Sequence, residues 1–428
     1  ETGMFGNWHL GDNYPYRPEE RGFTEVFRHG GGGAGQTPDY WDNAYFDGSY
    51  FHNGKVVPAK GFCIDVFFKA GNDFIRKSVA AKKPFFAYVA TNAPHVPLHC
   101  PQEYMDMYKG QNANIAAFFG MITNIDDNVA KTRALLKELG VYENTIFIYT
   151  TDNGTASGED VFNAGMRGAK GSPYDGGHRV PFFLHWPNGG FTKKHVVKEI
   201  TQAIDVVPTI LDLTGSTKPE GLKFDGVALR PILDSANETD WPKRYLITDS
   251  QRVVDPIKWR ESAVMSNQWR LINGKELYDI KADPGQKSDI AKQHPDQVAE
   301  MRAFYDAWWA ELEPNFSQTT EIYLGQPGYE KVSLTAHDWI GDSMPPWNQE
   351  FIRNSMAEKK DKQANLKYSS HWAVKVITPG TYEITAMRWP EEANHPITAA
   401  LPPGEDVPGA SKAFRTANGF ALPATAAT

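Results

Sequence analysis

The feature that most constrains the fold is the alternation of short apolar stretches with amphipathic helical patterns over about the first 215 residues. Four stretches have the apolar composition of buried strands: residues 4–9, 85–91, 145–151 and 179–186. Helices are predicted at residues 62–80 and 115–139, and Gly140 follows the second as a stop signal. Strands separated by helices favour an α/β fold, with a mainly parallel sheet sandwiched by helices.

The pattern changes after about residue 240. Short strands at residues 262–265 and 269–272, followed by a helix at 297–312, predict a smaller α+β subdomain. Beyond Pro327 the sequence is rich in proline and aromatic residues, and alternation at residues 372–377 and 381–387 predicts a β-rich extension. We therefore expect three parts: a catalytic α/β domain at 1–240 that lacks its N-terminal portion, the α+β subdomain at 241–316, and an incomplete β-rich region at 317–428.

Charge and composition exclude several classes of protein. The formal net charge of −8 disfavours a nucleic-acid partner, which normally requires a basic face. No stretch approaches the roughly 20 apolar residues needed to span a bilayer, so no membrane span is predicted. The two cysteines, Cys63 and Cys100, are not in a metal-binding spacing and are interpreted as buried thiols.

Ligand sites in parallel α/β sheets lie beyond the carboxyl ends of the strands, which directs attention to the polar residues that follow each predicted strand. The stretch from Gly6 to Gly11 places His9 after the first strand, and His95 lies between two prolines after the second. Either imidazole has a plain structural interpretation as well, because a histidine beside a turn often caps its own loop. A rigid loop that presents an imidazole can also donate a proton or bind an anion.

Asp152 and Asn153 follow the third strand and offer a carboxylate and an amide oxygen, the ligand types that calcium prefers. An ordinary Asp-Asn-Gly turn would have the same sequence. Further along, Lys170 stands between small residues and can approach an anion closely, although such a lysine is usually only solvated. Arg179 is interpreted as a partner for a buried carboxylate, whereas the role of His178 stays open.

In order and spacing, these segments resemble the type I, formylglycine-dependent sulfatases of the alkaline-phosphatase superfamily. The stretch from Gly6 to Gly11 resembles the family's Gly-Lys-Trp-His-Leu-Gly signature, with Asn7 in place of the lysine. The resemblance covers residues 1 to about 315 and includes the later segments 224–229, 276–279 and 283–284. It implies an alkaline-phosphatase-like fold and hydrolysis of a sulfuric ester on a sulfated small molecule or glycan, most plausibly a carbohydrate.

The resemblance also implies roles for single residues. His9, His95 and Lys170 would be catalytic: His9 would hydrogen-bond the nucleophile, His95 would steer or protonate the leaving oxygen, and Lys170 would neutralise developing charge. Asn7 and His178 would bind substrate, and Asp152 and Asn153 would be ligands of one calcium ion. The formylglycine nucleophile, made from a Cys or Ser, is expected upstream of residue 1, so residues 1–428 alone are expected to be inactive.

Two other functions stay open on the sequence alone. A phosphatase or phosphodiesterase could use the same scaffold, because phosphate and sulfate share size and shape. A non-catalytic relative could bind sulfated glycans through Lys170 and the aromatic residues between 40 and 51, which either stack on sugars or pack a loop. The family resemblance further implies a periplasmic or extracellular location.

Overall fold

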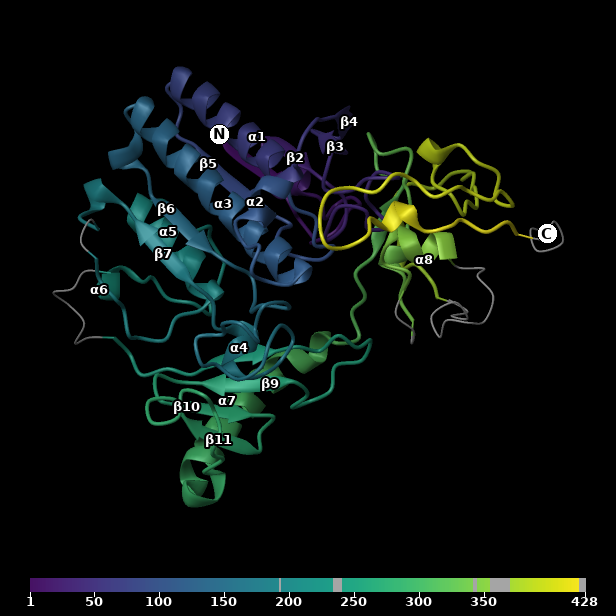
Figure 1. The fold of residues 1–428 in the computed structure, drawn as a ribbon. Coiled ribbons are helices and arrows are strands. Elements are labelled where there is room, and N and C mark those ends of the chain that lie inside the picture. Colours follow the sequence, from purple (N-terminus) through teal and green to yellow (C-terminus); the bar gives the residue numbers. More distant parts are fainter. Residues whose placement is uncertain (192–193, 234–240, 342–344, 355–369, 423–428) are drawn as a thin grey trace. The chain divides into compact units, whose positions relative to one another are not determined.

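The computed structural model describes residues 1–191, 194–233, 241–341, 345–354 and 370–422 (Figure 1). The chain forms two compact units. The first consists of Glu1–Leu135 together with Thr319–Thr428, and the second of Leu136–Gln318. The three-part division expected from the sequence stays a prediction.

A five-stranded sheet, in the order β4-β3-β2-β1-β5, is the centre of the first unit. Strand β1 (Thr2–Gly6) pairs in parallel with β2 (Glu25–Arg28) on one side and with β5 (Phe86–Ala90) on the other. Strands β3 (Ser49–His52) and β4 (Lys55–Pro58) extend the sheet antiparallel beyond β2. The parallel part confirms the α/β class, and it brings the carboxyl ends of β2, β1 and β5 to one edge.

Helix α1 (Cys63–Ala80) packs against β1, β5 and β2 because its apolar residues recur every three to four positions. Its Phe74 ring lies 5.5 Å from the ring of Phe5, which is buried in the middle of β1. The unit also contains α2 (Gln102–Asp106) and most of the long α3 (Ala113–Glu138). Both long helices agree closely with the helices predicted from periodicity. Cys63 and Cys100 are buried free thiols, as predicted.

Residues 319–428, called the C-terminal extension below, contain little regular structure in their described part. Strands β12 (Ile322–Leu324) and β13 (Val374–Val376) pair in parallel, and α8 (Gln349–Asn354) is short. The strand predicted at 381–387 is wrong: these residues are exposed and form no ladder, and the side chain of Ile384 is 92% exposed. The alternation there has no buried face against which to pack.

The second unit is built on an antiparallel sheet in the order β11-β10-β9-β8. Its strands are β8 (Leu246–Asp249), β9 (Ser262–Met265), β10 (Trp269–Ile272) and β11 (Glu276–Asp279). Helix α7 (Pro295–Leu312) covers the sheet, and Met301, Tyr305 and Trp309 pack on apolar side chains of β9, β10 and β11. This arrangement confirms the predicted α+β subdomain.

A separate pair of strands, β6 (Phe147–Thr150) and β7 (Phe182–His185), runs antiparallel in the same unit. Both strands were predicted, but their antiparallel pairing was not. The remaining helices of the unit are α4 (Asp175–His178), α5 (Val206–Thr214) and α6 (Arg230–Leu233). In the described part of the chain, no helix has the length and apolar character needed to cross a membrane.

Candidate active site

The carboxyl ends of β2, β1 and β5 carry polar residues at adjacent positions. Asn7 and His9 follow β1, His29 follows β2, and His95 lies in the loop after β5. Because β1 pairs in parallel with both neighbours, these residues belong to the same edge of the sheet. The sequence prediction that His9 and His95 share one edge is therefore consistent with this topology.

Asn7 is fixed by backbone contacts on both sides. Its amide N–H donates to the Ala90 carbonyl at 2.7 Å, and its Nδ2 donates to the Gly32 carbonyl at 3.3 Å. Its Oδ1 is buried and has no hydrogen-bond partner among the described residues. An unpartnered buried acceptor is costly, and it leaves Asn7 able to accept a hydrogen bond from a bound group.

The ring of His9 lies beside a glycine-rich loop. A Cβ atom added at Gly32 would come within 2.3 Å of Cε1 of His9, so only a glycine leaves room for the imidazole. His9 itself has a φ of 50°, a left-handed conformation that few non-glycine residues adopt. The ring centroid of His337 lies 5.9 Å from that of His9.

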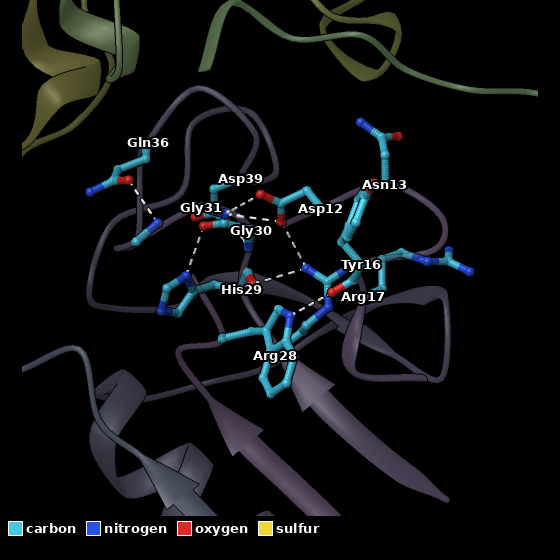
Figure 2. Close-up of polar contacts among 12 residues, drawn as sticks. Asp12, Asn13, Tyr16, Arg17, Arg28, His29, Gly30, Gly31, Gln36 and Asp39 are labelled. Atoms are coloured by element: carbon cyan, nitrogen blue, oxygen red, sulfur yellow. Dashed lines mark hydrogen bonds and ion pairs between the residues drawn. The ribbon is translucent and has the colours of Figure 1, made fainter. Parts of the chain in front are cut away.

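The loop of residues 30–36 directs its backbone amides at the protein's own side chains (Figure 2). Gly31 N–H donates to both carboxylate oxygens of Asp12 at 3.1 Å, and Gly32 N–H donates to Gln36 Oε1 at 2.7 Å. Asp39 accepts from the amides of Gly30 and Gly35. Burial raises the pKa of Asp39 to about 7. Because these amides bond to the protein's own side chains, they support the conformation of the loop.

Asp12 also pairs with the buried guanidinium of Arg28, whose Nη1 lies 3.0 Å from Asp12 Oδ1 (Figure 2). The same Nη1 donates to the His29 carbonyl at 3.3 Å. Trp8 Nε1 donates to the Tyr16 carbonyl at 2.8 Å and closes the turn that carries His9. These contacts hold the turn and the glycine-rich loop together as one scaffold.

His29 was not predicted as a site residue. Its ring is fully buried, and its Nδ1–H donates to the Gly30 carbonyl at 2.8 Å. Burial lowers the pKa of His29 to about 4, so the ring is neutral at physiological pH. His29 directly follows β2, so the search for polar residues after predicted strands would have found it. The strand β2 itself was not recognised in the sequence.

His95 is half-buried in the loop after β5. Its Nδ1–H donates to the Val96 carbonyl at 2.7 Å, which fixes the ring orientation. The His95 carbonyl accepts from the hydroxyl of Tyr45 at 3.0 Å, so a core side chain fixes the backbone. Tyr45 and Tyr50 are fully buried and Trp41 nearly so, and these three members of the aromatic stretch therefore pack the loop onto the domain.

Within the second unit, the turn of Asp152 and Asn153 follows β6. Asp152 is exposed, and Asn153 Nδ2 donates to its Oδ2 at 2.5 Å. Gly154 is required because an added Cβ would come within 1.9 Å of the Gly176 carbonyl oxygen. Its N–H donates to the Gly177 carbonyl at 2.9 Å. The turn is thus anchored to the α4 segment while both oxygen-bearing side chains extend from it.

Lys170 and His178 belong to the same unit as that turn. The half-buried Lys170 donates its backbone N–H to the Thr155 carbonyl at 2.7 Å. His178 Nε2 contacts the Pro173 carbonyl at 3.1 Å, and burial lowers the pKa of His178. A neutral ring with Nε2–H bonded to its own loop has Nδ1 left as the acceptor. The structure therefore gives His178 a local structural contact beside any role in binding.

The buried carboxylate of Asp175 holds this segment in place. Arg270 Nε lies 2.7 Å from Asp175 Oδ1, and Arg179 Nη1 lies 3.6 Å from Oδ2. The interpretation of Arg179 as a partner for a buried carboxylate is confirmed. Arg270, from β10, links this loop to the antiparallel sheet of the same unit.

A calcium ion requires about six to eight oxygen ligands. Asp152 and Asn153 supply the right types of oxygen from an exposed turn, so they fit such an ion as part of its ligand set. No group of three or more acidic, histidine or cysteine side chains with metal-site geometry occurs within the described residues. The two side chains would therefore need further ligands to complete the site.

The parallel sheet of the first unit carries histidines at its carboxyl edge, and an oxygen-rich turn follows β6 in the second unit. Comparison with known families is more specific. The Sulfatase family model matches residues 1–216, half of the chain, and a model described as N-sulphoglucosamine sulphohydrolase, C-terminal matches residues 169–304. The chain belongs to the sulfatase family.

Curated relatives agree with this assignment. The uncharacterized sulfatase YdeN of Escherichia coli is 28% identical over 264 residues, covering 55% of this chain and 45% of its own length. The N-acetylgalactosamine-6-sulfatase of Canis lupus familiaris is 28% identical over 310 residues, covering 68% of this chain and 56% of its own length. The chain thus spans about half the length of the curated relatives it matches.

A solved structure supports the fold. The crystal structure of Ps i-CgsB in complex with k-i-k-neocarrahexaose has 29% sequence identity and a TM-score of 0.61. The match covers 72% of this chain and 71% of that chain. The alkaline-phosphatase-like α/β fold expected from the sequence is confirmed.

Proposed function

We propose that the protein hydrolyses a sulfate ester and that its substrate is a sulfated carbohydrate. The family match over residues 1–216 carries this proposal, together with the position of Asn7 and His9 at the carboxyl edge of the parallel sheet. A relative named N-acetylgalactosamine-6-sulfatase and a structure in complex with k-i-k-neocarrahexaose favour a saccharide substrate. A periplasmic or extracellular location would suit such a substrate.

In this proposal the residues of the first unit handle protons and hydrogen bonds. His9 hydrogen-bonds the nucleophile, for which its ring is held against Gly32. His95 protonates the leaving oxygen through Nε2, because Nδ1 is already bonded to Val96. Asn7 binds a sulfate oxygen through the second N–H of its Nδ2, since the first is donated to Gly32, and it adds no charge where the family signature has a lysine.

The residues of the second unit bind the sulfate group and a metal ion. Lys170 neutralises the negative charge that develops on the sulfate oxygens, and His178 is the second substrate-binding residue. Asp152 and Asn153 would hold a calcium ion, which, when bound, polarises a sulfate oxygen as a Lewis acid. The nucleophile is proposed to be a formylglycine. Residues 1–428 do not contain the motif with the Cys or Ser from which a formylglycine is made.

The test is to measure sulfate released from N-acetylgalactosamine 6-sulfate and other sulfated sugars by the protein in its natural length, co-produced with a formylglycine-generating enzyme. His9→Ala and Lys170→Ala should each lower kcat by about 10²- to 10³-fold, the usual effect of removing a proton-transfer or charge-stabilising group. Wild-type rates in either variant would refute its assigned role. Absence of sulfate release by the wild type would refute the function.

A further inference from the structure

The C-terminal extension lies along the segment that follows the turn carrying His9. Tyr16 OH donates to the Glu321 carbonyl at 3.0 Å, and Tyr329 OH donates to Glu20 Oε1 at 2.7 Å. The Arg17 guanidinium carbon lies 4.6 Å from the centroid of the Tyr329 ring. Two hydrogen bonds and one cation–π contact therefore attach residues 321–329 to residues 16–20 within the first unit.

The contacts between the C-terminal extension and the residues after His9 continue at residues 333–338. Asn13 Nδ2 donates to the Ser333 carbonyl at 3.1 Å and lies 3.4 Å from Asp338 Oδ2. Trp372 Nε1 donates to the Thr335 carbonyl at 2.7 Å and supports the one-turn 3₁₀ helix Ala336–Asp338 from the other side. This turn is thereby held next to the residues that follow His9.

His337 lies in the middle of that turn, and its ring lies beside that of His9. Its ring centroid lies 5.9 Å from that of His9, at an interplanar angle of 48°. The side chain is half-buried, and within the described part of the chain neither of its ring nitrogens makes a hydrogen bond. A partly buried ring whose nitrogens make no hydrogen bond is suited to bind a ligand group.

The charge state of His337 limits which ligand group that is. Burial and the proximity of His9 lower the pKa of His337, and the negative charge of Asp12 opposes them only in part. A neutral imidazole has one N–H donor and one acceptor nitrogen. A hydroxyl group, which both donates and accepts, can use both the donor and the acceptor of this ring, whereas a sulfate, which only accepts, can use the donor alone.

We propose that His337 is a substrate-binding residue that hydrogen-bonds a hydroxyl of the sugar carrying the sulfate ester. The inference rests on the proposed function, because it takes His9 as a group at the sulfate. It assigns the C-terminal extension a part in recognising the sugar, in addition to its packing on the first unit.

The experiment compares His337→Ala with the wild type, in the protein of natural length, by calorimetric binding of N-acetylgalactosamine 6-sulfate, galactose 6-sulfate and inorganic sulfate. We expect the variant to bind the best of the two sugars about tenfold more weakly, since a net hydrogen bond contributes about 1 kcal/mol. Its affinity for inorganic sulfate should stay within about twofold. His371→Ala, which removes an exposed imidazole from the same extension, should bind both ligands as the wild type does.

Equal weakening toward the sugar and inorganic sulfate would show that His337 positions His9, and it would overturn the proposal. Unchanged sugar binding in His337→Ala would also overturn it. If the wild type binds inorganic sulfate but neither sugar, the proposal is again contradicted. Turnover of an aryl sulfate in the same preparation tests the proposed function separately, because it requires no sugar contact.

Discussion

The imidazole of His9 occupies the space that a side chain at Gly32 would fill, since a Cβ atom added at Gly32 would lie only 2.3 Å from Cε1 of the ring. The neighbouring Gly33 is different, because a Cβ there would meet nothing closer than Gln36 Nε2 at 3.3 Å. Neither glycine has the positive φ that would itself strain an alanine. The two positions therefore form a matched pair for testing the role of His9.

Gly32→Ala should displace the His9 ring and lower kcat for a sulfate ester by about 10²-fold or more, the scale of a misplaced proton-transfer group. Gly33→Ala should retain activity within about threefold, since it adds the same methyl group away from the ring. Steady-state kinetics of both variants, with circular dichroism to confirm folding, measures this. Equal activity of the two variants would contradict the placement of His9 in the catalytic site.

Asp152→Ala should weaken calcium binding by roughly tenfold or more, because it removes the carboxylate from the proposed ligand pair. Asp160→Ala is the control, since Asp160 is an exposed carboxylate in the same segment. Calorimetric titration with calcium reads the affinity directly and does not depend on turnover. Identical calcium affinity in both variants would remove Asp152 from the metal site.

His99 makes stability sensitive to acid. Its ring is fully buried, and burial lowers its pKa to about 4, below the value of about 6.5 in an unfolded chain. The unfolded state therefore binds more protons between these values, and stability is lost as the pH falls from about 6.5 to 4. The full linkage effect is on the order of 3 kcal/mol.

His99→Phe should remove this part of the acid sensitivity. The unfolding free energies of wild type and variant are measured by denaturant titration at pH 7.5 and pH 4.5. The wild type should lose more unfolding free energy than the variant at the lower pH. His371→Phe changes an exposed histidine and should show no such shift. A pH-independent difference for His99→Phe would show that folding leaves the pKa of His99 unchanged.

Arg353 joins separate segments of the C-terminal extension to one another and to Asp42. Its buried guanidinium donates to the carbonyls of Pro402 and Ala417 and to Asp42 Oδ1, the last at 2.5 Å. Arg353→Met should lower the unfolding free energy by about 2 to 4 kcal/mol, because it removes three hydrogen bonds of a buried guanidinium, one of them to the half-exposed carboxylate of Asp42. Lys331→Met removes an exposed ion pair and should cost less than about 1 kcal/mol in the same denaturation experiment. Similar losses in both variants would contradict this account.

Long periodic elements were predictable from the sequence because their burial is regular. Helices α1 and α3 were located closely, since each has apolar residues at helical spacing. Strand β5 was located by its apolar composition, but it was expected to be buried, and Phe86 and Tyr88 are exposed. Strand β2 was missed because it is short and carries the buried Arg28, whose charge is balanced by Asp12. The pairing of β2 in the sheet is decided by tertiary structure, because this strand has no apolar pattern of its own. Local propensity therefore gives no signal for it.

The candidate site was predictable to the extent that it follows strand ends. His9 and His95 were located by that rule, whereas His29 was lost together with β2. His337 could not be found at all, because only folding brings the C-terminal extension beside the turn of residues 6–11. The strand predicted at 381–387 failed for the related reason that alternation predicts a strand only where one face is buried.

The central claim is that this scaffold hydrolyses sulfate esters, and the most direct test compares two substrates with the same leaving group. The wild-type protein in its natural length, with calcium present, is assayed on p-nitrophenyl sulfate and p-nitrophenyl phosphate. We predict a kcat/KM for the sulfate that exceeds that for the phosphate by at least about tenfold, a preference of roughly 1.4 kcal/mol in transition-state binding. A clear preference for the phosphate, or hydrolysis of neither ester, would contradict the account.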